Sequence, residues 1–149
     1  MSLRDSEYIN REAISQPKAY RRPRPVGGNK IMTIPMLYSK LHRAAVTGAD
    51  LHYEGSIAID TTLITAAKLR QLQMVEIYNI NNGERFSTYV IAGSPGEVSL
   101  NGAAARRVQK GDLLIICAYS QVALDEADVH QAKIVLLGEG NVIEKTFDQ

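Results

Sequence analysis

The chain has 149 residues, of which 45% are hydrophobic and 22% are charged, and its formal net charge is +1. This length corresponds to one domain with a sizeable core, and the composition excludes a disordered or fibrous protein. The longest apolar run, 113–119, is far shorter than the roughly 18 residues needed to cross a bilayer, so we expect no membrane segment.

The first thirty residues differ in charge from the rest of the chain. Residues 1–30 hold seven Lys or Arg and three acidic residues, a net charge of +4, whereas the remainder carries −3. This stretch includes the Arg-Pro-rich run 21–25 and little apolar periodicity, which predicts a disordered basic arm without a catalytic role. A vector-derived or misassigned start is the alternative, with Met32 or Met36 as the true beginning. The apolar patch 31–38 is too short and too interrupted for a secretory signal.

One short helix is predicted between residues 60 and 73. Apolar residues recur at helical spacing from Leu63 to Ala67. Two threonines precede them, and either Thr61 or Thr62 can cap the start of a helix.

The rest of the chain reads mostly as short strands separated by turns. Segments 75–80 and 85–92 are rich in Val, Ile, Tyr, Phe and Thr, and the Asn-Asn-Gly-Glu between them predicts a hairpin. Segments 112–119 and 132–137 resemble buried strands, divided by a polar stretch, 124–129, that predicts one or two helical turns. Many short strands with little helix favour a small closed barrel or a sandwich.

Several kinds of site are disfavoured by the motifs that are missing. Cys117 is the single cysteine, which excludes an intrachain disulfide and favours a reducing, intracellular location; we expect the cytoplasm. The three histidines, His42, His52 and His130, lie far apart without metal-ligand spacing, so we expect no metal site. The segment 93–96 is a glycine-rich turn without the Lys-Ser/Thr of a phosphate loop.

A glycine–serine bond at Gly55-Ser56 is the most informative feature. A serine hydroxyl can attack the preceding carbonyl if the fold holds that peptide in a strained turn, and glycine has no Cβ to block the approach. A second such bond occurs at Gly93-Ser94, and the dipeptide by itself is more often an ordinary tight turn. The surrounding sequence must therefore supply the specificity.

Four segments in order carry a resemblance to a known family. The stretch 52–60, the hairpin residues 82–89, the Asn-Gly-Ala-Ala-Ala of 101–105 and the Lys-Leu-His-Arg of 40–43 together resemble the aspartate 1-decarboxylase family. These pyruvoyl-dependent lyases make β-alanine for pantothenate biosynthesis. The resemblance runs from about Met36 to near the C-terminus, so it covers almost everything except the basic arm.

The resemblance implies a fold, an assembly and a cofactor. Residues 31–149 should form a mainly β domain, a six-stranded double-psi β-barrel with short helices, assembled as a homotetramer with active sites between neighbouring subunits. The precursor should cut itself between Gly55 and Ser56 and convert Ser56 into a covalent pyruvoyl group, with release of ammonia. That ketone would form a Schiff base with the amine of L-aspartate and accept electrons during loss of carbon dioxide. We expect neither a membrane nor a nucleic-acid partner for this enzyme.

The same resemblance implies residue roles. Tyr89 is expected to donate the proton that quenches the carbanion, because a phenol keeps its proton at neutral pH. Thr88 is expected to bind substrate and assist self-cleavage. Small residues that admit a ligand close to the main chain form the substrate-binding loop, and charged and polar residues complete the site. The loop residues are Gly102, Ala103 and Ala104; Lys40 and Arg85 would meet the carboxylates, Tyr53 and Asn101 would orient the pyruvoyl group, and His42 would lie nearby.

Two features depart from a simple transfer of these roles. The family commonly has cysteine directly after the serine, whereas this chain has Ile57. On a regular strand Arg85 and Tyr89 share one face while Thr88 points to the other. A bend, a bulge or contributions from two subunits would be needed to bring all three together.

Two competing functions stay open at this point. One is a non-catalytic barrel that binds nucleic acid or an acidic partner through the basic arm. The other is a decarboxylase that acts on a related acidic amino acid. Whether self-cleavage is spontaneous or assisted by a maturation factor is also undecided.

Overall fold

The computed structural model describes residues 31–149, and the disordered arm expected over residues 1–30 lies outside this range. Strands dominate the described part. They are β1 (Thr33–Ala45), β2 (Gly48–Asp50), β3 (Ser56–Asp60), β4 (Met74–Asn79), β5 (Arg85–Gly93), β6 (Val98–Asn101), β7 (Leu113–Ala123), β8 (Lys133–Leu137) and β9 (Ile143–Asp148). The helices are α1 (Thr61–Ala66) and the 3-10 helices η2 (Gly102–Arg107), η3 (Leu124–Val129) and η4 (Glu139–Asn141).

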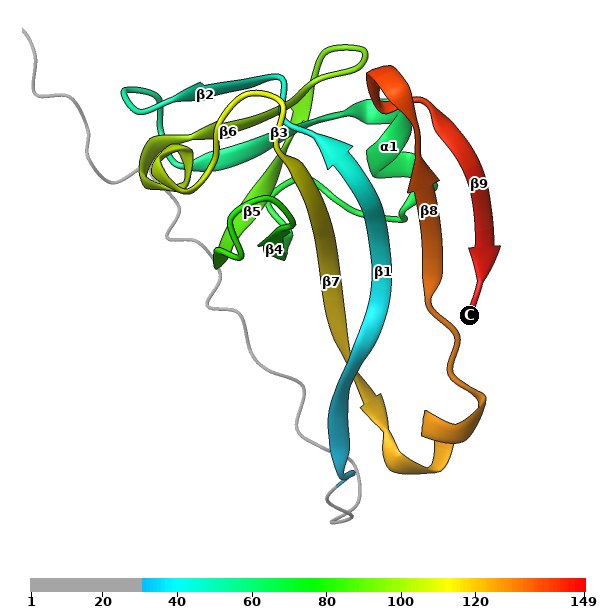
Figure 1. Ribbon diagram of the computed structural model, residues 1–149. Coiled ribbons are helices and arrows are strands. Elements are labelled where there is room, and N and C mark those ends of the chain that lie inside the picture. Colours follow the sequence, from blue (N-terminus) through cyan, green and yellow to red (C-terminus); the bar gives the residue numbers. More distant parts are fainter. Residues whose placement is uncertain (1–30) are drawn as a thin grey trace, which may run out of the picture. The chain divides into compact units, whose positions relative to one another are not determined.

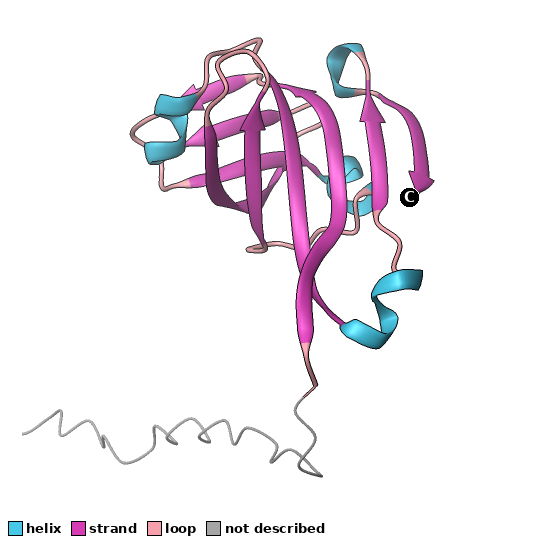
Figure 2. Cartoon of the chain, turned by 60° about the horizontal axis from the view of Figure 1, so that its bottom comes forward, coloured by secondary structure: helices cyan, strands magenta, loops and turns pink. Residues whose placement is uncertain are grey.

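The strands join in the order β2-β6-β3-β5-β4-β7-β1-β8-β9 (Figure 1). Three pairs are parallel, namely β1 with β8, β2 with β6 and β3 with β5, and the other pairs are antiparallel. Figure 2 shows the strands curving around a common interior, with the short helices at the ends of strands. The mainly β fold with short helices is therefore confirmed, and the sheet adds strands beyond the six expected, among them the three-residue β2.

The core is built from residues that alternate along the strands. In β4, Val75 and Ile77 are buried while Met74 is exposed, which is the period-two pattern of a strand with one face inside. Each large aliphatic side chain buried in this way contributes about 1.5–3 kcal/mol. Because nearly every strand supplies core residues, the ends of β3, β5 and β6 are fixed relative to one another. The core includes Leu41, Ile57, Ile59, Val90, Leu100, Leu114, Ile116 and Val135.

Strands β1 and β7 form a long antiparallel pair (Figure 1). Their register shifts twice, between Leu37 and Ser39 and between His42 and Ala44. Arg43, inside the second shift, has a φ of 68°, a conformation that a β-bulge can require. After the first shift Lys40 lies opposite Cys117, so this bulged register determines where Lys40 and His42 sit.

The predicted strands and hairpin are confirmed. Strands β4 and β5 pair as an antiparallel hairpin, and Gly83 in its turn has a φ of +75°. Strand β7 continues to Ala123, four residues past the predicted end, and the predicted helical turns at 124–129 are the 3-10 helix η3. Within the described residues no helix has both the length and the apolar character needed to cross a membrane.

The predicted helix is present as α1, but the predicted cap is wrong. Asp60, and not Thr61 or Thr62, is the N-cap, because its carboxylate accepts a hydrogen bond from the Thr62 N–H at 2.7 Å. Its other oxygen accepts from the Gly96 N–H at 2.7 Å. These bonds, led by the one from Gly96, hold the pKa of Asp60 below its ordinary value of 3.8.

Replacement of Asp60 by Ala should lower the free energy of unfolding by about 1–2 kcal/mol, since the capping bond from Thr62 and the bond from Gly96 are both lost. Because the folded-state pKa of Asp60 is depressed, its stabilising effect is present above the unfolded pKa and is lost as pH falls through the folded pKa. The difference between wild type and variant should therefore shrink below about pH 4. Urea unfolding at pH 7 and pH 3 measures both effects. Asp125→Ala, an exposed carboxylate in η3, is the control, and an equal loss in both variants would contradict the assignment.

Candidate active site

Ser56 is the first residue of β3, and its hydroxyl is held in a fixed place. The residue is 1% exposed and lies opposite Asn101 of β6. Asn101 Nδ2 donates a hydrogen bond of 2.9 Å to Ser56 Oγ, and that hydroxyl donates weakly to the Glu54 carbonyl at 3.4 Å. Gly55, in contrast, is exposed. The hydroxyl is thus buried and oriented directly beside a peptide bond that opens to the surface.

The backbone of Gly102 packs against Gly55. Gly102 has a φ of +64°, and a Cβ at this position would lie 2.8 Å from the Gly55 Cα and 2.9 Å from its nitrogen. Real Cβ atoms do not approach backbone atoms this closely. Glycine at position 102 therefore allows the loop after β6 to contact the Gly55-Ser56 peptide, and it also tolerates the left-handed backbone.

An open pocket of about 370 Å³ lies beside Gly55. Pairing between β3 and β5 begins at Ile57 and Val90, so the earlier residues of β5 extend past the start of β3. Both faces of β5 can reach the pocket there, because no β3 residue is paired with this edge. The pocket is lined by Gly55, Thr88, Tyr89, Ala103 and Ala104, together with Phe86, Ser87 and Arg107.

This strand edge explains how Thr88 and Tyr89 meet at one pocket, whereas Arg85 does not line it. Thr88 and Tyr89 project to opposite faces of β5, yet both line the pocket, and no bulge is needed to bring them together.

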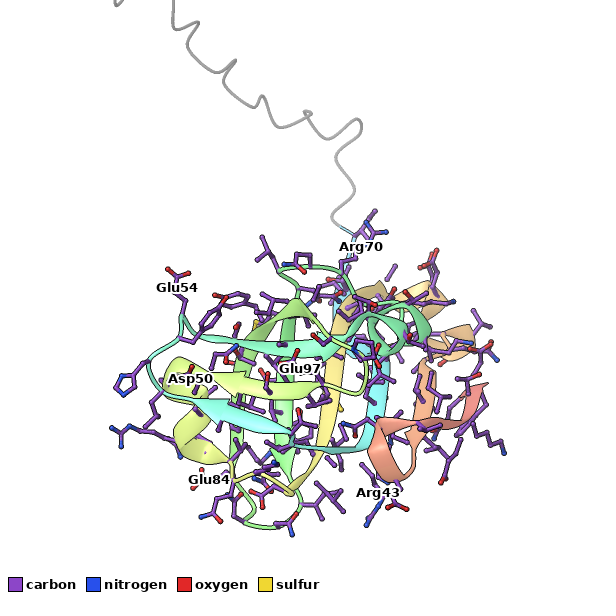
Figure 3. All side chains as sticks on the ribbon, turned by 90° about the horizontal axis from the view of Figure 1, so that it is seen from above. Arg43, Asp50, Glu54, Arg70, Glu84 and Glu97 are labelled. Carbon is purple, nitrogen blue, oxygen red and sulfur yellow. The ribbon has the colours of Figure 1, made fainter. Side chains whose placement is uncertain are left out.

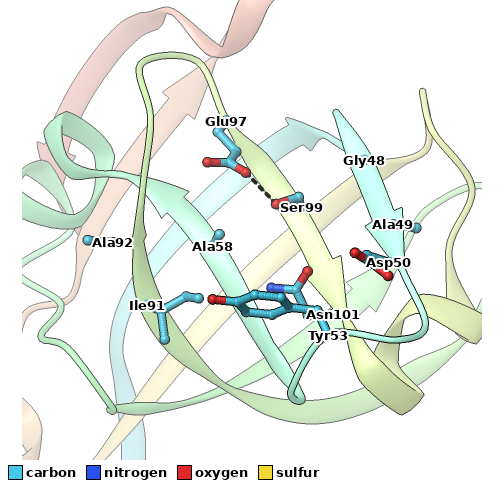
Figure 4. Close-up of a pocket in the computed structure, with 10 residues that line it drawn as sticks. All are labelled: Gly48, Ala49, Asp50, Tyr53, Ala58, Ile91, Ala92, Glu97, Ser99 and Asn101. Carbon is cyan, nitrogen blue, oxygen red and sulfur yellow. Dashed lines mark hydrogen bonds between the residues drawn. The ribbon is translucent and has the colours of Figure 1, made fainter.

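Tyr53 and Asn101 line a neighbouring hollow of about 380 Å³ (Figure 4). Ala58 and Ser99 form part of its wall, and Ser99 donates a hydrogen bond of 2.7 Å to Glu97. Asn101 thus belongs to this hollow and also holds the Ser56 hydroxyl. Tyr53 is 56% exposed.

Lys40 and Arg85 do not reach the pocket within one chain. The Arg85 guanidinium lies 3.8 Å from the centre of the Tyr78 ring, on the outer face of the β4–β5 hairpin. Lys40 lies opposite Cys117 in the β1–β7 pair, and neither cation is among the residues that line the pocket. They form a second polar group on the outer face of the sheet.

His42 belongs to that outer group. Burial lowers its pKa from 6.5, and the positive charges of Lys40 and Arg43 lower it further. Its Nδ1 is buried and has no hydrogen-bond partner among the described residues. A neutral imidazole beside two cations is therefore the form present near neutral pH.

Sequence reasoning missed the aromatic and sulfur groups beside Arg85. Tyr78 and Tyr119 share a hydrogen bond of 2.9 Å between their hydroxyls, which raises the pKa of Tyr119, and burial raises the pKa of Cys117. It also missed Arg107 at the pocket. The alternation of β4 and β7 places Tyr78 and Tyr119 on outer faces, but their partnership depends on strand register, which no local motif specifies. Residues 31–149 contain no group of three or more His, Cys, Asp or Glu side chains placed to hold a metal ion.

A small β-barrel with a pocket beside the glycine that precedes a buried serine is the architecture of the double-psi β-barrel decarboxylases. The aspartate decarboxylase family model matches residues 32–144. The chain belongs to the aspartate decarboxylase family.

Named relatives agree with this membership. The aspartate 1-decarboxylase of Methylibium petroleiphilum is 60% identical over 111 residues, 73% of this chain and 92% of the relative. The protein of the same name from Ralstonia pickettii is 59% identical over 111 residues, with the same coverage, and that from Helicobacter acinonychis is 58% identical over 116 residues, 76% of this chain and all of the relative. A non-catalytic barrel that binds nucleic acid finds no support in these similarities.

Proposed function

We infer that this chain is an enzyme that removes the α-carboxylate of L-aspartate to give β-alanine and carbon dioxide, a step that supplies pantothenate biosynthesis. Family membership supports the inference. The structural observation that carries it is the Ser56 hydroxyl, buried and bonded to Asn101, next to a glycine that opens on a pocket. We also propose the cytoplasm as its location.

Self-cleavage at Gly55-Ser56 would produce the reactive group. Ser56 Oγ attacks the Gly55 carbonyl carbon, the peptide C–N bond breaks, and the hydroxyl proton passes to the freed nitrogen, which leaves an ester. Elimination then breaks the Cβ–O bond of residue 56, which frees the Gly55 carboxylate and leaves dehydroalanine. One water molecule converts dehydroalanine to a pyruvoyl group and releases ammonia. Asn101, through its bond to Oγ, orients the attacking atom.

The residues around this position fit a pyruvoyl group. Gly55 lines the pocket and is separated from residue 56 by the cleavage, so the group formed at residue 56 would lie next to the pocket. When present, the pyruvoyl group supplies the electron sink that decarboxylation requires. The chain's own contribution is to bind and to move a proton: Tyr89 offers a phenolic O–H at the pocket wall, and Thr88 offers a hydroxyl for substrate. The small side chains of Ala103 and Ala104 leave main-chain groups accessible.

A neighbouring subunit would complete the site. Lys40 and Arg85 lie on the outer face of the sheet, away from the pocket of their own chain. A substrate with two carboxylates needs cations, and within residues 31–149 the pocket lining offers only Arg107. We therefore propose a homotetramer in which Lys40 and Arg85 of one chain face the Ser56 site of the next, with His42 beside Lys40.

Mixed oligomers test this shared site. An Arg85→Ala chain keeps Ser56, and a Ser56→Ala chain keeps Arg85, so a site formed between them can carry both functional residues. Co-expression of the two inactive variants should restore activity roughly tenfold or more above either variant alone. Carbon dioxide release from the purified hetero-oligomer is the measurement. Hetero-oligomers that form, as shown by affinity tags on both chains, but stay inactive would place each site within one chain.

The activity itself is tested by a substrate comparison. Carbon dioxide release from L-aspartate should be accompanied by an equal amount of β-alanine, with a higher kcat/KM than for L-glutamate under the same conditions. A higher kcat/KM for L-glutamate would instead assign a related acidic amino acid as the substrate. No carbon dioxide from either substrate would refute the proposed function.

A further inference from the structure

Arg107 is a cation at the pocket beside Gly55, supplied by the same chain. It is the last residue of η2, three residues beyond Ala104. Among the described residues that line the pocket, its side chain is the only charged one, and the others are small, aromatic or hydroxyl residues. The family resemblance attaches no role to this position, and without Arg107 the residues described at the pocket would carry no positive charge.

Hydrogen bonds hold the end of η2, and with it the backbone of Arg107, in a fixed position. Its carbonyl oxygen accepts hydrogen bonds from the side-chain amides of Asn79 at 3.2 Å and Asn82 at 3.0 Å. The Asn79 amide also donates to Asp112 at 2.9 Å, and Asn79 is 3% exposed. The backbone of Arg107 is thus attached to the β4–β5 turn at a partly buried position, which limits the volume that its side chain can sample.

The guanidinium of Arg107 makes an ion pair with Glu84. Arg107 Nη1 donates to the Glu84 carboxylate at 2.5 Å, with side chains that are 53% and 40% exposed. Glu84 lies at the edge of the molecule in Figure 3. A guanidinium has five N–H donors in a planar fork, so one contact with Glu84 leaves several donors available to another anion.

We propose that Arg107 binds the side-chain carboxylate of the substrate at the pocket of its own chain, and that Glu84 occupies part of the guanidinium until the substrate binds. The inference rests on the proposed function and deepens it, since it adds a specificity-determining cation to the site. An acidic amino acid has a side-chain carboxylate for this contact, which a neutral amino acid lacks, and no other positive side chain among the described residues lines the pocket. Because Arg107 is half exposed, solvent screens the contact and its effect is moderate.

A structural brace is the competing role for the same ion pair. In that role the Arg107–Glu84 contact would only tie η2 to the β4–β5 turn, and loss of either partner would have the same consequence. In the binding role the two partners have opposite effects, because Glu84 competes with the substrate for the guanidinium. The two roles therefore differ in the sign expected for a Glu84 variant.

Steady-state kinetics on the mature enzyme distinguishes them. Arg107→Leu should raise the KM for L-aspartate roughly fivefold, the equivalent of about 1 kcal/mol, with kcat within about twofold of wild type. Glu84→Gln should leave KM unchanged or lower it. Arg106→Leu, the adjacent arginine that does not line the pocket, is the matched control and should have no effect. An unchanged KM in Arg107→Leu, or an equal rise in Arg107→Leu and Glu84→Gln, would overturn the proposal.

A binding measurement separates this proposal from the proposed function. Succinate has two carboxylates and no amine, so its affinity, measured by ligand-observed NMR, does not require turnover. Its dissociation constant should rise roughly fivefold in Arg107→Leu and stay constant in Arg106→Leu. Weaker succinate binding by Arg107→Leu in a protein that decarboxylates nothing would support the Arg107 site while refuting the proposed function. Equal succinate affinity in an active enzyme would refute the Arg107 site alone.

Discussion

A Ser56→Ala chain is expected to stay in one piece and to release no carbon dioxide from L-aspartate. Alanine has no hydroxyl to attack the Gly55 carbonyl, so neither the cleavage nor the ketone can form. The activity should fall at least about 10⁴-fold, to the background of the assay. A denaturing gel after long incubation, together with carbon dioxide release, measures both consequences. The fold should survive, because the lost hydroxyl makes only two hydrogen bonds.

The chain contains a natural control for this experiment. Gly93-Ser94 is a second glycine–serine bond, and Ser94 lies exposed in a turn, with its N–H bonded to Glu97. Ser94→Ala should therefore be cleaved and active like wild type. Cleavage that persists in Ser56→Ala, or that disappears in Ser94→Ala, would assign the reaction to a different bond.

Gly102→Ala should slow self-cleavage at least roughly tenfold and lower the free energy of unfolding by about 2–3 kcal/mol. The added Cβ would lie 2.8 Å from the Gly55 Cα and 2.9 Å from its nitrogen, so the peptide to be cleaved must move away from the Ser56 hydroxyl. Left-handed backbone adds about 1–2 kcal/mol of strain for a residue with a Cβ. Quantified gel bands over time give the cleavage rate, and urea unfolding gives the stability.

Gly140→Ala is the control that has the strain of a left-handed backbone but no close contact with Gly55. Gly140 has a φ of +69°, close to the +64° of Gly102, but a Cβ there would have nothing within 4 Å. It should lose about 1 kcal/mol of stability and cleave at the wild-type rate. If Gly102→Ala and Gly140→Ala cleave equally fast, the contact between Gly102 and Gly55 has no part in maturation.

Much of the fold could be predicted because its signals are local. The alternation along β4, the Asn-Gly turn after it and the apolar run of β7 each identify an element from neighbouring residues alone. The cap of α1 could not be chosen in this way. Asp60, Thr61 and Thr62 are all capping residues, and Asp60 prevails because its second oxygen also binds the distant Gly96 N–H.

The site was predictable only as a set of residues, and its geometry was not. The resemblance named Gly55, Thr88 and Tyr89, but their meeting depends on where β3 starts relative to β5, which is a matter of register. The contact between Gly102 and Gly55 joins residues far apart in sequence through a single missing Cβ. No periodicity in the sequence predicts such a contact.

The positions of the charged side chains are the feature of the site that the sequence predicts least. Arg85 is one strand residue among several, and its position over Tyr78 follows from the hairpin pairing of β4 with β5. Arg107 carries no motif and could as well have been a solvated surface charge. It lies at the pocket because two asparagine amides fix the end of η2, and amide partners of this kind are not visible in a sequence.

Intact-mass spectrometry of the aged, purified protein tests the central claim most directly. Two chains should be found, one ending at Gly55 with a free carboxylate and one beginning at residue 56. The second should be lighter than the chain Ser56–Gln149 by one molecule of ammonia, since the serine has become a pyruvoyl group. A single uncleaved mass, or a fragment that keeps the full mass of an N-terminal Ser56, would show that the backbone does not generate the electron sink on which the proposed catalysis depends.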